Sequence, residues 1–161
     1  MKPRLTALVF TNLLVLATLM FTGCASGDKF TSGPPPTPDK ARIYVYRKAG
    51  AFGYAGYDKV YVNNTLLATM RLGGYATTDM PPGTVAFSLN PKMSSFPGDP
   101  LIAAIANQNK TQYEKLRIEV EAGKTYYVNL YVATTTHKMK VVDEATGAKE
   151  IRSLNLCKPG D

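Results

Sequence analysis

The sequence predicts an all-β fold, an antiparallel β-sandwich of about eight short strands. The stretch "KLRIEVE" places Leu116, Ile118 and Val120 on one face and charged residues on the other, which is the alternation of a half-buried strand. The stretch "TVAFSL" at 84–89 repeats this period of two. The composition is 45% hydrophobic and 10% aromatic, mostly Tyr, which favours a globular, strand-rich chain.

Two further segments predict strands in the middle of a sheet. "ARIYVYR" at 41–47 and "TYYVNLYVA" at 125–133 are apolar on both faces. A strand that is covered on both sides shows this pattern, because neither face meets water.

Residues with turn chemistry separate the predicted strands. Asn63 and Asn64 lie between "KVYV" and "TLLATM", and Asn tolerates the positive φ that a two-residue hairpin needs. "MPPG", which ends at Gly83, and "EAGK" at 121–124 predict two more turns. "DEATG" predicts another, before "AKEIRSLNL", which fits a strand or a short helix.

One segment departs from the β pattern. Asp99 provides an N-cap and Pro100 a first-turn proline, and "LIAAIAN" follows with apolar residues at helical spacing. We expect a short helix at about 100–108; the alternative is a buried strand.

The length and charge limit the possible functions. A chain of 161 residues fits one domain plus terminal extensions. The formal net charge is +7, and removal of residues 1–23 leaves 17 Lys and Arg against 12 Asp and Glu, or +5. These basic residues are scattered, so we do not expect nucleic-acid binding.

The first residues form a secretory pattern. Lys2 and Arg4 precede an uncharged stretch at 5–21, followed by small residues, which is typical of a signal peptide. The stretch is 17 residues long and contains polar residues, so a permanent membrane span fits less well. We therefore predict a signal peptide at 1–23.

"FTGC" at 21–24 resembles a bacterial lipobox, in which a cysteine receives lipid and becomes the first residue after cleavage. The resemblance implies a diacylglyceryl thioether on Cys24 and an amide-linked acyl chain. Two or more chains hold a protein on a membrane almost permanently. Ala25, where inner-membrane lipoproteins carry Asp, implies the outer membrane, facing the periplasm. The alternative is a secreted protein with an unmodified thiol.

Residues 24–40 are expected to be a lipid-anchored Cys and a tether, and residues 41–157 the domain. The tether is rich in Gly, Ser and Pro, and could reach on the order of 50 Å when extended. Cys157 is then the one cysteine left, and it fits a buried small side chain, a free thiol or an intermolecular bridge.

Several stretches together resemble the bacterial domain of unknown function 2846: "ARIYVYR", "VYVNNTLLATMRLGGY", "MPPGTVAFSL", "EAGKTYYVNL" and "VVDEATGAKEI". The resemblance covers most of residues 40–156. It implies a small β-sandwich, similar to surface-layer and carboxypeptidase-regulatory domains, displayed on a lipid anchor. It implies no activity and no site residues, and residues 91–112 look like an insertion.

The sequence predicts no catalytic residue, metal site or cofactor. His137 is the only histidine, which excludes a metal site with two His ligands. Ser94 or Ser95 with His137 and Asp143 can be written as a triad, but no nucleophile-elbow context supports it. The glycine-rich stretch at 50–56 lacks the features of a phosphate loop and predicts an inter-strand loop.

Tyrosines give the candidate binding site. Tyr44 and Tyr46 share one face of their strand, as do Tyr127 and Tyr131. If the two strands are neighbours, the four rings form a patch suited to a protein partner or a sugar. The alternative is that residues 91–112 cover this face as a second core.

We therefore expect a lipid-anchored envelope protein whose non-enzymatic domain binds an unknown envelope protein or cell-wall glycan. Membrane attachment through Cys24 would confine the domain and raise its effective concentration near its partner. The alternatives are a cell-wall hydrolase, and a carrier of a small ligand or lipid in the periplasm.

Overall fold

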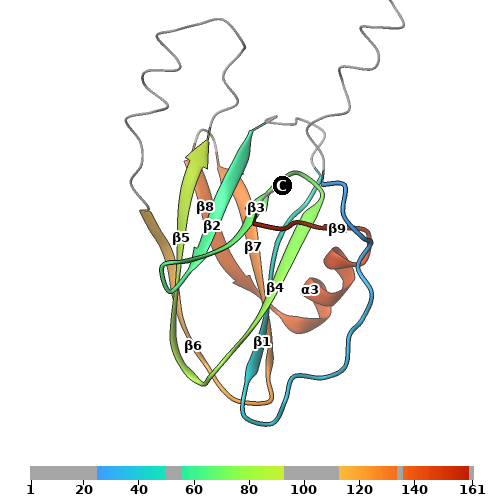
Figure 1. The fold of residues 1–161 in the computed structure, drawn as a ribbon, viewed down its shortest axis with the longest axis vertical. Coiled ribbons are helices and arrows are strands. Elements are labelled where there is room, and N and C mark those ends of the chain that lie inside the picture. The colour runs from blue at the N-terminus through green and yellow to red at the C-terminus, as the bar shows by residue number, and fades with distance from the viewer. Residues whose placement is uncertain (1–24, 50–55, 93–112, 134–135, 160–161) are drawn as a thin grey trace, which may run out of the picture.

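The computed structural model describes residues 25–49, 56–92, 113–133 and 136–159. Two β-sheets pack face to face, and one helix lies outside them (Figure 1). The elements are β1 Ala41–Arg47, β2 Tyr57–Val62, β3 Thr65–Met70, β4 Gly74–Met80, β5 Gly83–Lys92, β6 Tyr113–Val120, β7 Thr125–Ala133, β8 Thr136–Val142, α3 Glu144–Ile151 and β9 Asn155–Leu156.

The strands are divided between a five-stranded sheet, in the order β8-β7-β1-β4-β9, and a four-stranded sheet, in the order β3-β2-β5-β6. Most neighbouring strands are antiparallel, and the exceptions are the parallel pairs β1–β7 and β4–β9. The chain changes sheet between β1 and β2, β3 and β4, β4 and β5, and β6 and β7. The all-β sandwich predicted from the sequence is confirmed.

The main core fills the space between the sheets. Val85, Phe87 and Leu89 of β5 are buried there, as their alternation predicted. Leu116 and Ile118 of β6 pack against the same cluster. β1 and β7 are interior strands of their sheet, in agreement with their apolar sequences. Cys157 is 3% exposed and belongs to this core, which agrees with its interpretation as a buried small side chain.

The predicted turns at Asn63 and at "EAGK" are present. Asn63 and Asn64 have φ of 45° and 66° and join β2 to β3, where Val62 pairs with Thr65. The Oδ1 atom of Asn63 also accepts a hydrogen bond from the amide of Ala86, at 2.9 Å. Gly123, with φ of 76°, completes the turn between β6 and β7.

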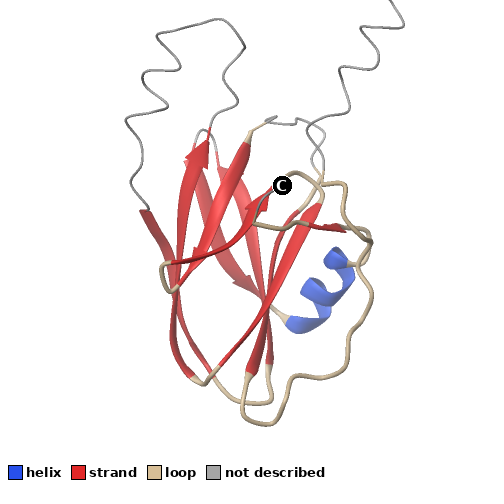
Figure 2. Cartoon of the chain, in the orientation of Figure 1, coloured by secondary structure: helices blue, strands red, loops and turns tan. Residues whose placement is uncertain are grey.

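The turn predicted at "DEATG" is wrong, because these residues begin helix α3. Asp143 is the N-cap, and its Oδ1 atom accepts a hydrogen bond from the amide of Thr146 at 2.9 Å. Gly147 lies inside the helix and not in a turn. Figure 2 shows the helix on the outer side of the five-stranded sheet, where it contacts β7.

Residues 25–30, which belong to the predicted tether, are bonded to the folded domain. The amide of Ala25 donates to the carbonyl of Leu72 at 3.0 Å, and the amide of Phe30 donates to the carbonyl of Leu154 at 2.9 Å. Lys29 also forms an isolated bridge with Asn155. Residues 25–30 therefore attach to the C-terminal segment through their backbone, a pairing that a Gly-, Ser- and Pro-rich composition does not reveal.

Several predictions concern residues outside the described ranges. These are the signal peptide at 1–23, the lipid site Cys24, most of the loop at 50–56, and Ser94, Ser95 and the helix at about 100–108. Within the described ranges, no helix has the length and apolar character needed to cross a bilayer.

Candidate functional site

The strands that carry the predicted tyrosine patch are neighbours. β1 and β7 pair in parallel, with Tyr44 opposite Tyr127. Their rings stack, with centroids 5.4 Å apart and an interplanar angle of 21°. Tyr46 lies opposite Asn129. Tyr131 lies beyond the part of β7 that pairs with β1, and Lys140 Nζ is 5.5 Å from its ring centroid. The patch therefore comprises three close rings with Tyr131 at its border.

Other parts of the chain cover this patch. Tyr44, Tyr46 and Tyr127 are 7%, 0% and 7% exposed. They form a second core cluster with Tyr75, Ile151 and Leu154, against which Phe30 packs. Phe30 makes edge-to-face contacts with Tyr44 and Tyr75, at centroid distances of 5.5 and 5.3 Å. The cover consists of α3 and the N-terminal segment, whereas the sequence interpretation considered residues 91–112.

Tyr46 is fixed by polar contacts as well as by burial. Its hydroxyl donates to Glu150 of α3 at 2.6 Å, and Lys48 Nζ lies 2.8 Å from the other oxygen of the same carboxylate. Burial, followed by the bond to Glu150, raises the pKa of Tyr46. The hydrogen bonds from Lys48 and Tyr46 lower the pKa of Glu150. These three side chains attach the helix to the end of β1.

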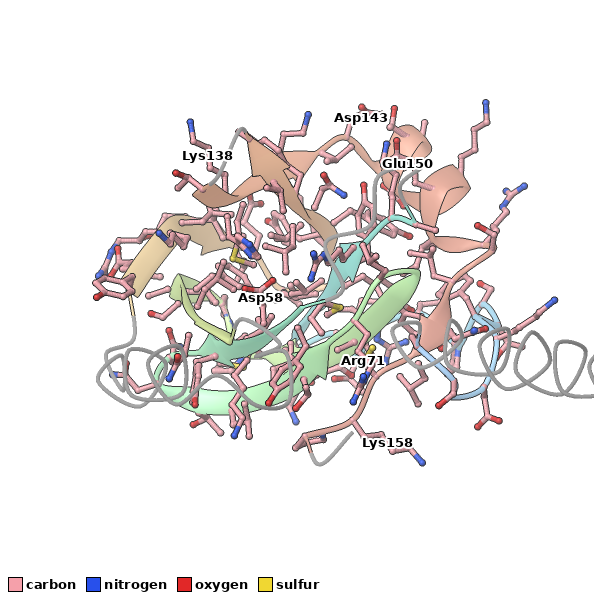
Figure 3. The ribbon with its side chains drawn as sticks, turned by 90° about the horizontal axis from the view of Figure 1, so that it is seen from above. Asp58, Arg71, Lys138, Asp143, Glu150 and Lys158 are labelled. Atoms are coloured by element: carbon pink, nitrogen blue, oxygen red, sulfur yellow. The ribbon has the colours of Figure 1, made fainter. Side chains whose placement is uncertain are left out.

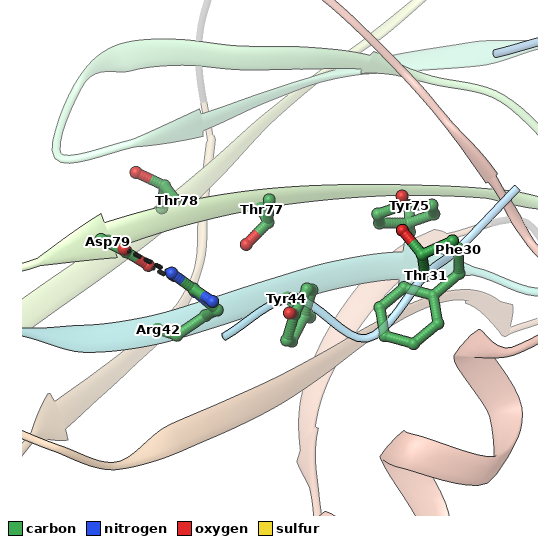
Figure 4. Close-up of a pocket in the computed structure, with 9 residues that line it drawn as sticks. Phe30, Thr31, Arg42, Tyr44, Tyr75, Thr77, Thr78 and Asp79 are labelled. Carbon is green, nitrogen blue, oxygen red and sulfur yellow. Dashed lines mark hydrogen bonds and ion pairs between the residues drawn. The ribbon is translucent and has the colours of Figure 1, made fainter. Parts of the chain in front are cut away.

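A groove remains beside the covered rings. It has a volume of about 410 Å³ and lies between Phe30, Tyr44 and Tyr75 at one end and Arg42 and Asp79 at the other (Figure 4). Arg42 binds Asp79 through two hydrogen bonds of 2.8 Å, and the guanidinium holds the pKa of this carboxyl below its usual range. A second groove of about 670 Å³ continues under residues 32–36 toward β7.

Half of the outer edge of β4 is open next to the first groove. β9 pairs with β4 only at Gly74 and Tyr75. The carbonyl of Gly73 accepts from the amide of Asn155, and the carbonyl of Tyr75 accepts from that of Cys157. Backbone groups alternate in direction along a strand, so those of Thr77 and Asp79 point to the same edge. Among the described residues, no strand pairs with this part of β4.

The C-terminal segment shows how this side of the sandwich accepts a strand. After pairing with β4, it crosses to β3, where the carbonyl of Lys158 accepts from the amide of Thr69 at 3.0 Å. A third hollow, of about 240 Å³, follows between the free edges of β3 and β4, lined by Leu66, Leu67 and Met80 among others. The C-terminal segment therefore covers one half of the gap between the edges of β3 and β4 and leaves the other half exposed.

A charged cluster lies between the sheets at the other end of β1. Asp58 is fully buried, and its Oδ2 atom lies 3.2 Å from Nη1 of Arg47 and 2.7 Å from Nδ1 of His137. Arg47 also donates to the carbonyl of Gly56 at 3.1 Å. The three side chains come from β1, β2 and β8, so the cluster ties the two sheets together. Figure 3 shows Asp58 in the interior, away from the labelled surface residues.

The triad written from the sequence is not assembled. His137 faces Asp58, while the carboxylate of Asp143 caps α3. His137 is a residue of β8, and the sequence did not indicate its buried partner. In the described ranges, no group of three or more His, Cys, Asp or Glu side chains is arranged to hold a metal ion.

The fold and groove define a β-sandwich with a partly open sheet edge. A family model described as "Protein of unknown function (DUF2846)" matches residues 37–144, so the chain belongs to this family, as its sequence motifs indicated. Phe30, most of α3 and β9 lie outside the matched residues. Comparisons with curated proteins and with solved structures find no match.

Proposed function

We propose that this protein is a lipid-anchored component of the bacterial cell envelope whose non-enzymatic domain binds an extended segment of a protein partner. The lipid would be attached to Cys24, and the open edge of β4 from Thr77 to Asp79 would pair with the partner's backbone. The open edge beside a groove is the observation that carries the binding proposal. We propose the outer membrane, facing the periplasm, as the location.

Strand addition uses the chemistry that this edge presents. The backbone N–H and C=O groups of Thr77 and Asp79 offer two donors and two acceptors to a new strand. Side chains of the added segment could enter the groove beside Tyr44 and Tyr75 or the hollow beside Leu66 and Met80. The groove supplies both apolar and polar contacts, which favours a peptide of mixed composition.

Only part of the predicted tyrosine patch contributes to this proposal. The faces of Tyr44, Tyr46 and Tyr127 are buried in the second core cluster, which leaves little ring surface for a sugar to stack on. Tyr44 contributes to the wall of the groove, and the other two rings hold α3 in place. A protein segment therefore fits better than a cell-wall glycan.

The other candidate functions receive less support. The space between the described parts of the two sheets is filled by core side chains, whereas a carrier would need an apolar cavity. For a hydrolase, the Asp58–His137 pair is the strongest starting point, yet Asp58 is also paired with Arg47 and fully buried. Asp58 and His137 connect the two sheets, so we assign no catalytic step to them.

Capture of the partner by crosslinking in intact envelopes tests the binding proposal. In Thr77→Pro, one edge N–H is lost, and proline also blocks the approach of a strand. One lost hydrogen bond is worth about 1 kcal/mol and the steric block adds to it, so we expect recovery to fall about tenfold or more. Val141→Pro is the matched control, because Val141 is exposed on β8, at the opposite edge of the same sheet, and its N–H points away from β7.

The outcomes separate the candidate partners. One reproducible protein that is lost in Thr77→Pro and retained in Val141→Pro supports strand addition. Equal recovery in both variants overturns it, and retention on isolated peptidoglycan would assign the glycan instead. Labelling with an alkynyl fatty acid tests the anchor separately, and equal incorporation into Cys24→Ser would refute lipid attachment at that cysteine.

A further inference from the structure

The N-terminal segment enters the folded domain at its first described residue. Ala25 is 5% exposed and belongs to the main core cluster. Its amide donates to the carbonyl of Leu72, and its carbonyl accepts from Nδ2 of Asn155 at 2.8 Å. Both backbone groups of Ala25 are therefore used by the domain, which fixes the position of this residue.

Residues 27–30 continue this attachment. The amide of Leu156 donates to the carbonyl of Asp28 at 2.8 Å, and Phe30 donates to Leu154. Gly27 lies directly on the C-terminal backbone, since a Cβ at this position would be 2.2 Å from the carbonyl oxygen of Leu156. A residue larger than glycine would push the segment away from β9 and break this pairing.

We propose that the domain lies directly on the bilayer in one orientation, with the end that carries Lys48, Arg71 and Lys158 against anionic phospholipid headgroups. This inference rests on the proposed lipid attachment at Cys24. Consecutive Cα atoms are about 3.8 Å apart, so a lipidated Cys24 is one residue from the folded body. A free tether of the predicted length would instead allow a separation on the order of 50 Å.

The residues at this end come together from four parts of the chain. Arg47 pairs with Gly74, which places Lys48 and the turn Arg71–Gly73 at one end of the sheet. Leu72 in this turn binds Ala25, and Lys158 reaches the same end through its bond to Thr69. Figure 3 looks onto this end and shows Arg71 and Lys158 close to each other, on the side away from Asp143 and Glu150.

The charge of this end suits an anionic surface. Lys48 and Lys158 are exposed and Arg71 is half-buried, with its guanidinium 5.7 Å from the ring centroid of Tyr57. Glu150 is bound to Lys48 and offsets part of its charge. Basic residues are attracted to an anionic membrane surface, and this attraction favours one orientation of a domain that the lipid already holds there.

Quenching by a lipid-bound probe tests the orientation. A fluorophore is placed on lipidated Ala49→Cys, which is exposed next to Lys48 and leaves the three basic residues in place, or on Lys124→Cys in the turn at the opposite end between β6 and β7. Cys157 is buried and does not compete for the label in the folded protein. The vesicles contain phosphatidylcholine, phosphatidylglycerol and a lipid with a spin-labelled headgroup. We expect strong quenching at position 49 and little at position 124.

Gly27→Val tests the cause of the orientation. It should release residues 25–30, adding on the order of 20 Å of slack, so that quenching at position 49 falls toward that at position 124. Gly33→Val is the matched control, because a Cβ there would meet only Nη1 of Arg42, at 3.4 Å. A Gly- and Ser-rich insertion between Cys24 and Ala25 gives the same slack without touching the fold, should Gly27→Val fail to fold.

Each result has a distinct meaning. Protein that does not float with the vesicles, or floats equally as Cys24→Ser, refutes the lipid anchor and with it this inference. Flotation with equal quenching at both positions, or with no change in Gly27→Val and in the insertion variant, overturns the orientation alone. If vesicles without phosphatidylglycerol give the same quenching at position 49, the proposed role of the basic residues is wrong.

Discussion

Gly147 of α3 and Tyr127 of β7 are in direct contact, and a Cβ at Gly147 would lie 2.3 Å from Cγ of the tyrosine ring. Glycine inside a helix costs about 1 kcal/mol relative to alanine. Here it allows the helix backbone to approach the ring face. The same contact buries Tyr127 and so converts part of the predicted binding patch into core.

Gly147→Ala is therefore expected to destabilise the protein despite the better helix propensity of alanine. Overpacking costs about 1 to 3 kcal/mol against a gain in helix propensity of about 1 kcal/mol, so we expect a net loss of up to about 2 kcal/mol. Urea denaturation measures it. In a Tyr127→Leu background the same substitution should be neutral or stabilising, and a stabilising effect in the wild type would contradict the close contact.

Asp58→Asn should lower the free energy of unfolding more than most polar substitutions do. It leaves Arg47 and His137 facing a neutral amide between the sheets, and breaking a buried ion pair costs about 3 to 5 kcal/mol. Asp79→Asn is the comparison, since its pair with Arg42 is partly exposed and its loss should cost about 1 kcal/mol. Equal losses in urea denaturation would show that the buried cluster has no special role.

Glu150 should contribute to the loss of stability in acid. Lys48, and then Tyr46, lower the pKa of its carboxyl in the folded protein. A lowered folded-state pKa means that the contribution is present above the unfolded value of about 4.3 and is lost as the pH falls through the folded value. The free energy of unfolding of Glu150→Gln should therefore decline less between about pH 6 and pH 3. Parallel curves for the two proteins would rule out this contribution.

The Asn63–Asn64 turn gives two substitutions of opposite effect. Asn63→Ala removes the bond to the amide of Ala86 and puts alanine at a positive φ, so a loss of about 1 to 2 kcal/mol is expected. Asn64→Gly keeps φ of 66° available at lower cost and should be neutral or slightly stabilising. Thermal unfolding of both variants checks the pair, and a stabilising Asn63→Ala would be inconsistent with this turn.

Local patterns in the sequence determined the strands and the hairpin. Alternation at Leu116, Ile118 and Val120 and the asparagines at 63–64 depend on neighbouring residues, so they can be interpreted without a fold. A short helix was one of two interpretations of "AKEIRSLNL", but the start of helix α3 was missed because Gly147 and the N-cap Asp143 also have turn chemistry. The contact with Tyr127 explains the glycine, and that contact joins residues 20 positions apart.

The sequence by itself determined an all-β sandwich, the family, and a lipobox pattern at Cys24. Only the tertiary structure decided which tyrosines are buried, that Asp58 meets His137, that half of the β4 edge is open, and that Ala25 is built into the domain. The physical reason is how far apart in the sequence the interacting residues are. Strand periodicity and turn conformation are set within a few residues, whereas pairing between sheets and between chain ends joins residues up to 130 positions apart.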